Sequence, residues 1–265
     1  MPATHAAAST PGVLAGQTIL VCGAHGGLGE AVARASARAG AQVILLGRRI
    51  PRLNKLYDAL EAEGARQPAI YPLDLAGATP QDYASLAETL QRECGRLDAI
   101  VHCAAEFKGL ASLENMPLED WFTGLHVNLT APWLLTRACL PLLRQRDDAS
   151  VLFLLDDPDQ TGRAFWGSYG VAKQALHGLI AILRDELANA SVRVHGVLPG
   201  PMRTALRARA FFAEDPGAIP LPEAYAPACI ALLAAGAGAA AEPIVTLSAQ
   251  DASPSRPLGL ATFTD

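Results

Sequence analysis

A tyrosine and a lysine stand four residues apart at positions 169 and 173, in the stretch FWGSYGVAK. If this stretch is helical, the two side chains lie on one face, one turn from each other. An ammonium group beside a phenol lowers the pKa of the phenol, which can then pass a proton to a substrate or take one from it. Tyr169 and Lys173 are therefore candidates for general acid–base chemistry.

The stretch ILVCGAHGGLGEAVA holds four glycines between an apolar run and an amphipathic one, and three of them, Gly23, Gly27 and Gly29, have the spacing GxxxGxG. Glycines at this place allow a tight turn and let backbone N–H groups approach a pyrophosphate at the start of a helix. The spacing predicts a dinucleotide site whose first loop contributes Gly23, His25, Gly26, Gly27, Leu28 and Gly29.

The end of the next apolar run, VILLGRR, indicates which dinucleotide binds. Sites for a free ribose 2′-hydroxyl place an acid near this point, but the sequence has Gly47 followed by Arg48 and Arg49. A guanidinium group matches a phosphate, so we expect NADP (NADPH) as the cofactor. Further along, Asp74 and Leu75 could hold the adenine, although a turn aspartate would give the same local pattern.

These residues need a framework of alternating strands and helices. Fully apolar strand candidates alternate with helical patterns, as expected for a parallel sheet covered on both faces. The expected strands are 18–22, 42–46, 69–73, 97–102, 150–155, 192–198 and 244–247. The expected helices are 28–39, 51–63, 80–94, 118–143 and 166–190. The fold class is α/β, a Rossmann-like doubly wound parallel sheet in a single domain.

We expect this domain to occupy residues 15–250, with a flexible N-terminal segment at 1–14 and a C-terminal tail at 251–265. Residues 203–221 interrupt the strand–helix pattern, and FFAEDPGAIPL within them combines aromatic residues with Pro and Gly. Such segments often close over ligands, so we predict a flap here.

Composition excludes several functions. The chain has 265 residues, 51% of them hydrophobic, and a net charge of −5 without a block of Lys and Arg. We therefore expect no nucleic acid among its ligands. The longest apolar run is too short to cross a bilayer, and the N-terminal stretch lacks the basic residues of a signal peptide, so no membrane is expected.

The five cysteines, at positions 22, 94, 103, 139 and 229, contain no CxxC pair. They are typical of the reduced thiols of a cytoplasmic protein, and no metal site is expected.

Taken in order, the motifs resemble those of the short-chain dehydrogenase/reductase family over about residues 16–247. They are GxxxGxG at 23–29, the aspartate at 74, HVNLTAP around Asn128, YxxxK at 169–173 and VLPGPMRT at 197–204. The resemblance implies seven parallel strands, a bound nicotinamide nucleotide and hydride transfer between a carbonyl and an alcohol. It also implies a homodimer or homotetramer, for which 118–143 and 166–190 would form a two-fold interface.

The resemblance also implies roles for single residues. Tyr169 would be the proton donor, Lys173 would bind the nicotinamide ribose, and Asn128 would hold a water of the proton relay. The remaining residues assigned to the cofactor by this resemblance are Ala104, Pro199, Gly200 and Thr204.

The sequence departs from the family pattern in three places. Cys22 stands where threonine is usual, and His-Cys-Ala-Ala at 102–105 stands where Asn-Asn-Ala-Gly is usual. The position thirteen residues before the tyrosine, usually serine, is Asp156. An ionised carboxylate cannot donate a hydrogen bond, and at ~4 Å it repels a developing alkoxide by about 4 kcal/mol at an effective dielectric of 20.

Four outcomes stay open at Asp156. It can be protonated and donate, it can turn away and leave Thr161 or a water to supply the hydroxyl, or the substrate can be a cationic amine or iminium. In the fourth, the site is impaired, and the protein is an NADP(H)-binding homologue with a binding or regulatory role. We expect an oxidoreductase acting on a carbonyl/alcohol or imine/amine pair, with the impaired homologue as the alternative and a structural oligomer as a third class.

Apolar residues cluster around the expected site and predict a largely apolar small-molecule substrate. The predicted wall residues are Glu106, Phe107, Lys108, Phe165, Trp166, Met202, Phe211 and Phe212.

Overall fold

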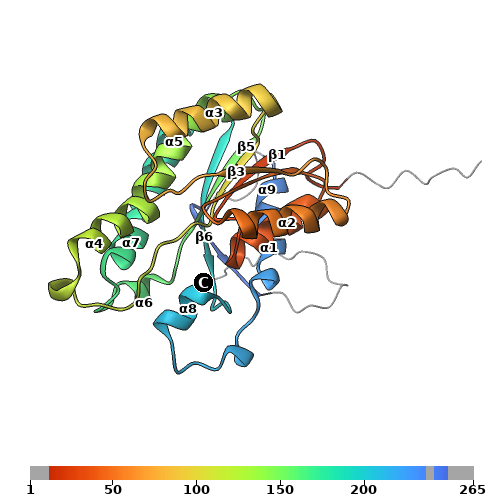
Figure 1. Ribbon diagram of the computed structural model, residues 1–265. Helices are drawn as coiled ribbons and strands as arrows, with labels where there is room; N and C mark the ends of the chain where they lie inside the picture. The colour runs from red at the N-terminus through yellow and green to blue at the C-terminus, as the bar shows by residue number, and fades with distance from the viewer. Residues whose placement is uncertain (1–11, 237–241, 250–265) are drawn as a thin grey trace, which may run out of the picture.

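The computed structural model describes residues 12–236 and 242–249. Its centre is a seven-stranded parallel sheet with the order β3-β2-β1-β4-β5-β6-β7 (Figure 1). The strands are β1 Thr18–Cys22, β2 Gln42–Gly47, β3 Ala69–Pro72, β4 Ala99–His102, β5 Ala149–Leu154, β6 Val192–Pro199 and β7 Ile244–Leu247. The prediction of an α/β fold with a parallel sheet is confirmed. The predicted strand starts agree best at the other strands and least at β4, which was predicted to begin at Leu97 and begins at Ala99.

Helices cover both faces of the sheet, which explains why the strands are apolar throughout. Along β1, Leu20 belongs to the core beneath α3, α5 and α7, whereas Ile19 and Val21 belong to the core beneath α1, α2 and α9. The helices are α1 Gly27–Arg38, α2 Ile50–Ala62, α3 Pro80–Cys94, α4 Leu118–Leu125, α5 Ala131–Leu143, α6 Pro158–Thr161, α7 Gly167–Glu186, α8 Ala205–Ala210 and α9 Ala226–Ala234.

The predicted single helix at 118–143 is interrupted by a π-helical turn, His126–Thr130, between α4 and α5. Pro132 follows this turn and has no N–H to give to the carbonyl of residue 128, so the α-helical ladder cannot continue there. The N–H of Ala131 bonds instead to the carbonyl of His126, five residues back. The turn places Asn128 toward the carboxyl ends of the strands, next to Glu106.

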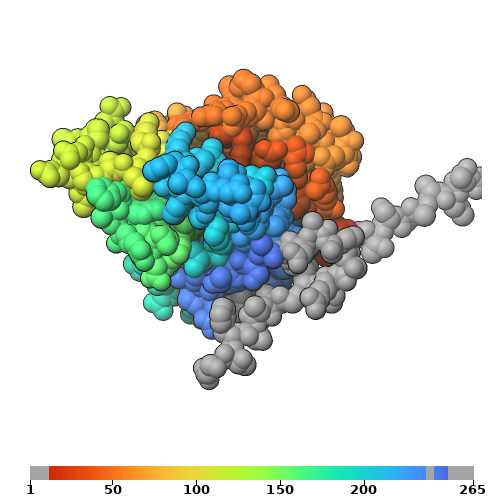
Figure 2. All heavy atoms as spheres, turned by 90° about the horizontal axis from the view of Figure 1, so that it is seen from below, coloured from red at the N-terminus to blue at the C-terminus, as the bar shows by residue number. Residues whose placement is uncertain are grey.

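The sequence analysis missed several elements, most of which are too short to display a helical pattern, whereas the nine residues of α9, APACIALLA, are apolar on every face and show no amphipathic period. They are the 3₁₀ turns Leu113–Asn115, Pro216–Ala218 and Pro222–Ala224, together with α6, α8 and α9. The predicted flap at 203–221 therefore contains α8 and one 3₁₀ turn. Figure 2 shows this light blue region at the centre of one face, between red-orange segments and yellow-green to green ones.

The predicted domain limits need one correction. Leu14 is fully buried and its N–H bonds to the carbonyl of Ala39, so ordered structure includes residues 12–14 of the expected flexible segment. The rest of that segment, 1–11, and the expected tail at 251–265 lie outside the described residues.

One stretch of the described residues, Pro216–Ala234, is long and apolar enough to pass a composition test for a membrane span. It is weak evidence, because the stretch is divided into two 3₁₀ turns and α9, and α9 packs against α1 with Cys229, Leu232 and Leu233 buried. These are the features of a core helix.

Candidate active site

A cavity of about 610 Å³ lies at the carboxyl ends of the strands, where the chain order reverses between β1 and β4. Ligands of doubly wound sheets bind at this reversal, and the volume is that of a typical ligand pocket. All predicted cofactor-binding and catalytic residues line the cavity except Gly29 and Asn128.

The first β–α turn forms a cradle that only glycine can build. Gly23 has φ +77°, and a Cβ there would lie 2.7 Å from the backbone of Ala104. A Cβ on Gly29 would collide with the carbonyl oxygen of Gly23. No side chain of the described residues caps the first turn of α1, so its N–H groups can meet an anion.

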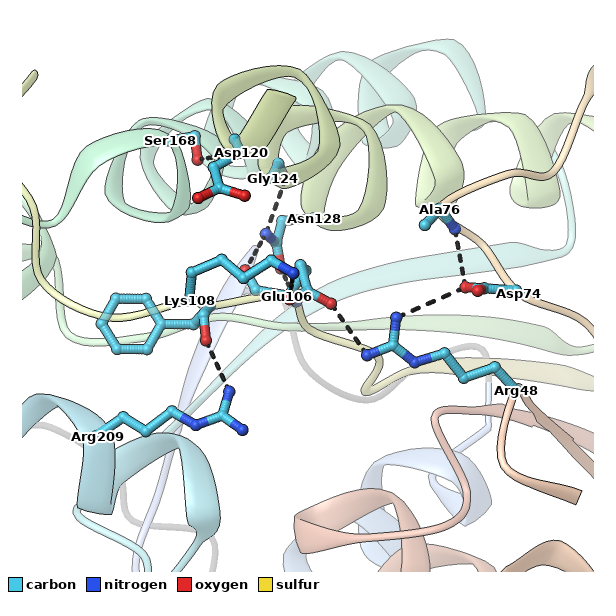
Figure 3. Close-up of polar contacts among 11 residues, drawn as sticks. Arg48, Asp74, Ala76, Glu106, Lys108, Asp120, Gly124, Asn128, Ser168 and Arg209 are labelled. Carbon is cyan, nitrogen blue, oxygen red and sulfur yellow. Dashed lines mark hydrogen bonds and ion pairs between the residues drawn. The ribbon is translucent and has the colours of Figure 1, made fainter. Parts of the chain in front are cut away.

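Arg48 is held by two acids beside the end of β2, the part of the cleft where the sequence analysis expects the 2′-phosphate and which is called the ribose end below (Figure 3). Its Nη2 lies 3.1 Å from Glu106 Oε2 and its Nη1 lies 3.7 Å from Asp74 Oδ1. Arg49 and Arg52 are exposed, line the cavity and have no acidic partner in the part of the chain that the structure describes. Arg52 was missed by the sequence analysis, although its place in the first turn of α2, just after Arg48 and Arg49, was the available signal.

Tyr169 and Lys173 are buried on α7, with side chains 5% and 3% exposed. Lys173 Nζ lies 5.5 Å from the centre of the Tyr169 ring and donates a 2.6 Å hydrogen bond to the carbonyl of Leu154. Burial lowers the pKa of Lys173 to about 8, and Asp156 partly opposes this shift. The expected arrangement on one helix face is present.

Asp156 points into the site. The Tyr169 hydroxyl donates a 2.7 Å hydrogen bond to Asp156 Oδ2, and the N–H of Asp157 donates to Oδ1 at 2.9 Å. Burial and the Asp156 charge raise the pKa of Tyr169 well above its usual value. The carboxylate therefore opposes the effect expected of Lys173 on the phenol.

Asp156 does not turn away from Tyr169 in this structure, and neither of two nearby hydroxyls takes its place. Thr161 donates its hydroxyl to the carbonyl of Asp157 at 2.9 Å. Ser168 donates to the carbonyl of Asp120 at 3.2 Å, on the side of α7 that contacts α4. Neither hydroxyl is directed at Tyr169.

Asn128 holds the backbone at the edge of the site rather than lining the cavity. Its Nδ2 donates to the carbonyls of Glu106 and Gly124 at 2.8 Å each, and its Oδ1 accepts from the N–H of Glu106 at 3.0 Å. Figure 3 shows this link beside the contact of Glu106 with Arg48. With both amide hydrogens given to carbonyls, a relay water would find only acceptor atoms on this side chain.

An aromatic cluster forms the wall beside Tyr169. The ring centre of Phe107 lies 5.4 Å from that of Trp166 and 5.2 Å from that of Tyr169, and the Trp166 and Phe211 centres lie 6.0 Å apart. Met202 also lines the cavity. Phe212 is 89% exposed, and Phe165 and Lys108 are exposed outside the lining, so these three predicted wall residues were wrong.

Arg209 reaches this wall from α8 and was also missed. Its Nη1 donates to the carbonyl of Phe107 at 2.9 Å (Figure 3). No local sequence pattern distinguishes it from a surface arginine.

The cleft fits a nicotinamide dinucleotide phosphate on its own features. The glycine turn leaves room for a pyrophosphate, three arginines line the ribose end, and His25 Nδ1 is buried without a polar partner among the described residues. An unpartnered buried nitrogen in a cleft indicates a place for a ligand or a water.

Comparison with known proteins agrees with this geometry. Residues 17–215 match the family model described as short chain dehydrogenase. The chain is similar to the uncharacterised oxidoreductase YciK of Escherichia coli K12, at 37% identity over 77% of this chain and 81% of the relative. It is 33% identical to the oxidoreductase UcpA of the same strain, over 78% of this chain and 79% of the relative.

Solved structures resemble the fold closely. One, described as a short chain dehydrogenase from Pseudomonas syringae, has a TM-score of 0.84 at 40% identity, covering 89% of this chain and 96% of the other. Another, from Shigella flexneri 2a and described as complexed with NADP, has a TM-score of 0.81 at 34% identity, covering 84% and 93%.

Proposed function

The chain belongs to the short-chain dehydrogenase family, and from this premise we propose that it is an NADP(H)-dependent oxidoreductase. The observation that carries the proposal is the joint placement of Tyr169 and Lys173 beside a glycine cradle and a group of arginines in one cavity. The relative from Shigella flexneri described as complexed with NADP supports the choice of cofactor. The substrate is a small, largely apolar carbonyl/alcohol or imine/amine compound held against Phe107, Trp166 and Phe211.

The residues that would hold the cofactor follow from the cleft. The turn from Gly23 to Gly29 and the start of α1 would bind the pyrophosphate, the arginines the 2′-phosphate, Asp74 and Leu75 the adenine, and Lys173 the nicotinamide ribose. Ala104, Pro199, Gly200 and Thr204 line the same cavity. When bound, the nicotinamide supplies or accepts the hydride.

We propose that Tyr169 is the proton donor or acceptor, with Asp156 at the position usually held by serine. Because the Tyr169 hydrogen is directed to Asp156, the phenol oxygen presents lone pairs to the cavity. A lone pair accepts from an alcohol O–H or an amine or iminium N–H, whereas a carbonyl oxygen requires a donor. Donation to a carbonyl therefore needs one more proton on the Tyr169–Asp156 pair or a rotation of the hydroxyl.

The same hydrogen bond supports the alternative function. A homologue that binds NADP(H) but turns over slowly or not at all would keep the cleft and lack an available proton donor. The hydrogen bond from Tyr169 to Asp156 supports this alternative, because it directs the phenol hydrogen away from a substrate. This alternative assigns the protein a binding or regulatory role.

We further propose a cytoplasmic homodimer or homotetramer whose two-fold interface uses the α4–α5 and α7 region. Large apolar side chains on these helices are exposed in the single chain: Leu118, Phe122, Trp133, Val171 and Ile182. Exposed apolar residues on packed neighbouring helices are common at subunit interfaces. The domain is proposed to end near residue 250.

Two measurements on the full-length protein test the function. The first is the thermal shift with NADPH, for which a ligand at 100 times Kd stabilises by about 2.7 kcal/mol. The second is NADPH oxidation with a panel of aldehydes, ketones and cyclic imines, with Tyr169→Phe as the matched control. A shift together with Tyr169-dependent turnover supports the oxidoreductase, and a shift without turnover supports the alternative. No shift and no turnover would contradict both.

A further inference from the structure

The flap carries two arginines that line the cavity and differ in their partners. Arg207 and Arg209 both belong to α8. Arg207 donates to the two carboxylate oxygens of Glu214 at 2.6 Å each, and its guanidinium lies 4.2 Å from the centre of the Phe211 ring. The charge of Arg207 is therefore compensated within the flap, and its side chain holds the flap together.

Arg209 has no acidic partner in the part of the chain that the structure describes. Its Nη1 donates to the carbonyl of Phe107 at 2.9 Å. Glu106, the acid beside that residue in the chain, pairs instead with Arg48 at 3.1 Å and with Lys108 at 3.6 Å. A guanidinium group has five N–H donors in a planar fork, and the carbonyl takes one of them. The charge and the remaining donors of Arg209 are therefore available to a ligand in the cavity.

The guanidinium of Arg209 lies at the aromatic wall of the site. Phe107, whose carbonyl it contacts, places its ring 5.2 Å from that of Tyr169 and 5.4 Å from that of Trp166. Figure 3 shows Arg209 approaching this segment from α8, whereas Arg48 reaches the neighbouring Glu106 from a different element. One residue, Phe107, thus contacts Arg209 through its backbone and the proposed acid–base residue through its ring.

Two acids line the cavity near the reacting group. Asp156 accepts the hydrogen bond of Tyr169, and Asp157 follows it in the chain. Neither forms an ion pair with a basic side chain of the described residues. An anionic group of a substrate would be repelled here and attracted by Arg209. The charge pattern therefore favours a substrate that is anionic at the end remote from its reacting group.

We propose that Arg209 is a specificity-determining residue that binds a carboxylate of the substrate, an inference that rests on the proposed oxidoreductase function. The substrate is then a largely apolar carbonyl or imine compound, or the corresponding alcohol or amine, with a carboxylate at the end remote from the reacting group. A planar carboxylate matches two parallel N–H groups of a guanidinium. Phe107, Trp166 and Phe211 hold the apolar body between this carboxylate and Tyr169.

The test is calorimetric titration of the full-length protein, saturated with NADPH, with 2-naphthoate and with 2-naphthamide. The two probes share an apolar body and differ in charge. We expect the parent to bind the carboxylate about five- to tenfold more tightly than the amide, because the contact is charge-assisted but the arginine is exposed. Arg209→Gln should lose this preference and bind the amide within about twofold of the parent.

Arg203→Gln is the matched control. Arg203 is an exposed arginine of the same flap, lies outside the cavity lining and donates to the carbonyl of Ile219 at 3.5 Å. This variant should keep the preference of the parent. A merely structural role of Arg209 would weaken both probes equally, because both need the flap in place. Equal weakening of the two probes, no preference in the parent, or a preference kept in Arg209→Gln would each overturn the inference.

Cofactor binding shows whether Arg209 acts on the substrate or on the nucleotide. Arg209→Gln should bind NADPH with a Kd within about twofold of the parent. A larger loss of NADPH affinity would assign Arg209 to the cofactor and overturn the inference. If the parent itself does not bind NADPH, the proposed function fails.

Turnover gives a second readout. The parent should reduce 3-benzoylpropionate with a kcat/KM about fivefold or more above that of its methyl ester, and Arg209→Gln should reduce both alike. Turnover of both ketones by the parent without a preference for the acid would contradict the inference and leave the proposed function standing. The naphthoate titration decides the role of Arg209 whether or not either ketone is turned over.

Discussion

The hydroxyl of Tyr169 donates a 2.7 Å hydrogen bond to the carboxylate of Asp156, thirteen residues earlier in the chain. The hydroxyl hydrogen of the proposed acid–base residue is therefore directed at the carboxylate and not at the cavity. Lys173, one turn further along α7, donates a hydrogen bond to the carbonyl of Leu154, and its Nζ lies 5.5 Å from the centre of the Tyr169 ring. Burial and the charge of Asp156 both raise the pKa of Tyr169, so both make it harder for the phenol to give up its proton.

Replacing Tyr169 by Phe should abolish turnover and leave cofactor binding intact. General acid catalysis contributes about 100-fold or more, so kcat should fall by at least that factor. The ring keeps its contacts with Phe107 and Trp166, so the NADPH-induced thermal shift should equal that of the parent. Steady-state NADPH oxidation and a melting curve measure the two quantities, and retention of more than about a tenth of kcat would exclude Tyr169 as the proton donor.

Replacing Asp156 by Ser should increase carbonyl reduction by about tenfold. Removing the carboxylate lowers the raised pKa of Tyr169 and releases its proton toward the cavity. Asp156→Asn, which keeps the shape and removes the charge, is the matched control. Reduced ketone turnover in both variants would contradict this prediction and indicate that Asp156 assists the reaction.

The alkaline limb of the rate profile should shift with the same variants. Lys173 carries its charge below a pKa of about 8, which Asp156 helps to keep from falling further. The rate should decline as the pH rises past about 8, and in Asp156→Asn the decline should begin at lower pH because the Lys173 pKa drops. The measurement is kcat between pH 6 and 10, and a limb that moves upward or stays in place would rule out Lys173 as its origin.

Two variants at the ribose end should have opposite effects. Arg48→Ala should weaken NADPH by about tenfold and leave NADH nearly unchanged, since a phosphate contact is worth about 1.4 kcal/mol or more. Glu106→Gln should tighten NADPH by about threefold, because it removes a charge that competes with the phosphate for Arg48. The measurement is the Kd of NADPH and of NADH for each variant, with Arg38→Ala as a surface control. Weaker NADPH binding in Glu106→Gln would instead indicate that Glu106 positions Arg48 for the phosphate.

Acid should destabilise the fold through His102. Burial lowers the pKa of His102 to about 3, whereas an unfolded histidine titrates near 6.5. The stabilisation from its neutral form is complete above pH 6.5 and is lost as the pH falls toward 3. His102→Asn should flatten the dependence of the unfolding free energy on pH over this window. It should also cost about 1 kcal/mol at neutral pH, because the stacking on Phe153 at 4.7 Å is lost. Parallel denaturation curves that keep the parent slope would exclude His102.

The sheet and most of the site could be predicted because both depend on local patterns. Apolar runs, glycine spacing and the four-residue interval of Tyr169 and Lys173 are properties of short stretches, and the fold brings them together at the carboxyl ends of the strands. The pairing of Arg48 with Glu106 joins residues 58 positions apart. No pattern in the neighbouring sequence predicts Glu106 as the partner of Arg48. Nor does one predict whether the Asp156 side chain points toward Tyr169.

The short elements around the cleft were less predictable for a different reason. α6 has only four residues and α8 only six, too few to display a period. The exposure of Phe212 beside half-buried Phe211 likewise depends on how the flap lies over the cavity. From the sequence alone, both phenylalanines are expected to line the wall of the site.

The π-helical turn at His126–Thr130 amounts to one surplus residue wound into an otherwise regular rod. Deleting a single residue there, together with replacing Pro132 by Ala, would allow the rod to close as an uninterrupted α-helix. Each residue of an α-helix turns the chain by about 100° about the helix axis. Removing one residue would therefore rotate α4 by that angle relative to α5 and move the Asn128 amide away from Glu106. The backbone of Glu106 would then lose its hydrogen bonds to Asn128. Because Glu106 also holds Arg48, a deletion in the π-helical turn would change the position of the arginine that is proposed to bind the 2′-phosphate.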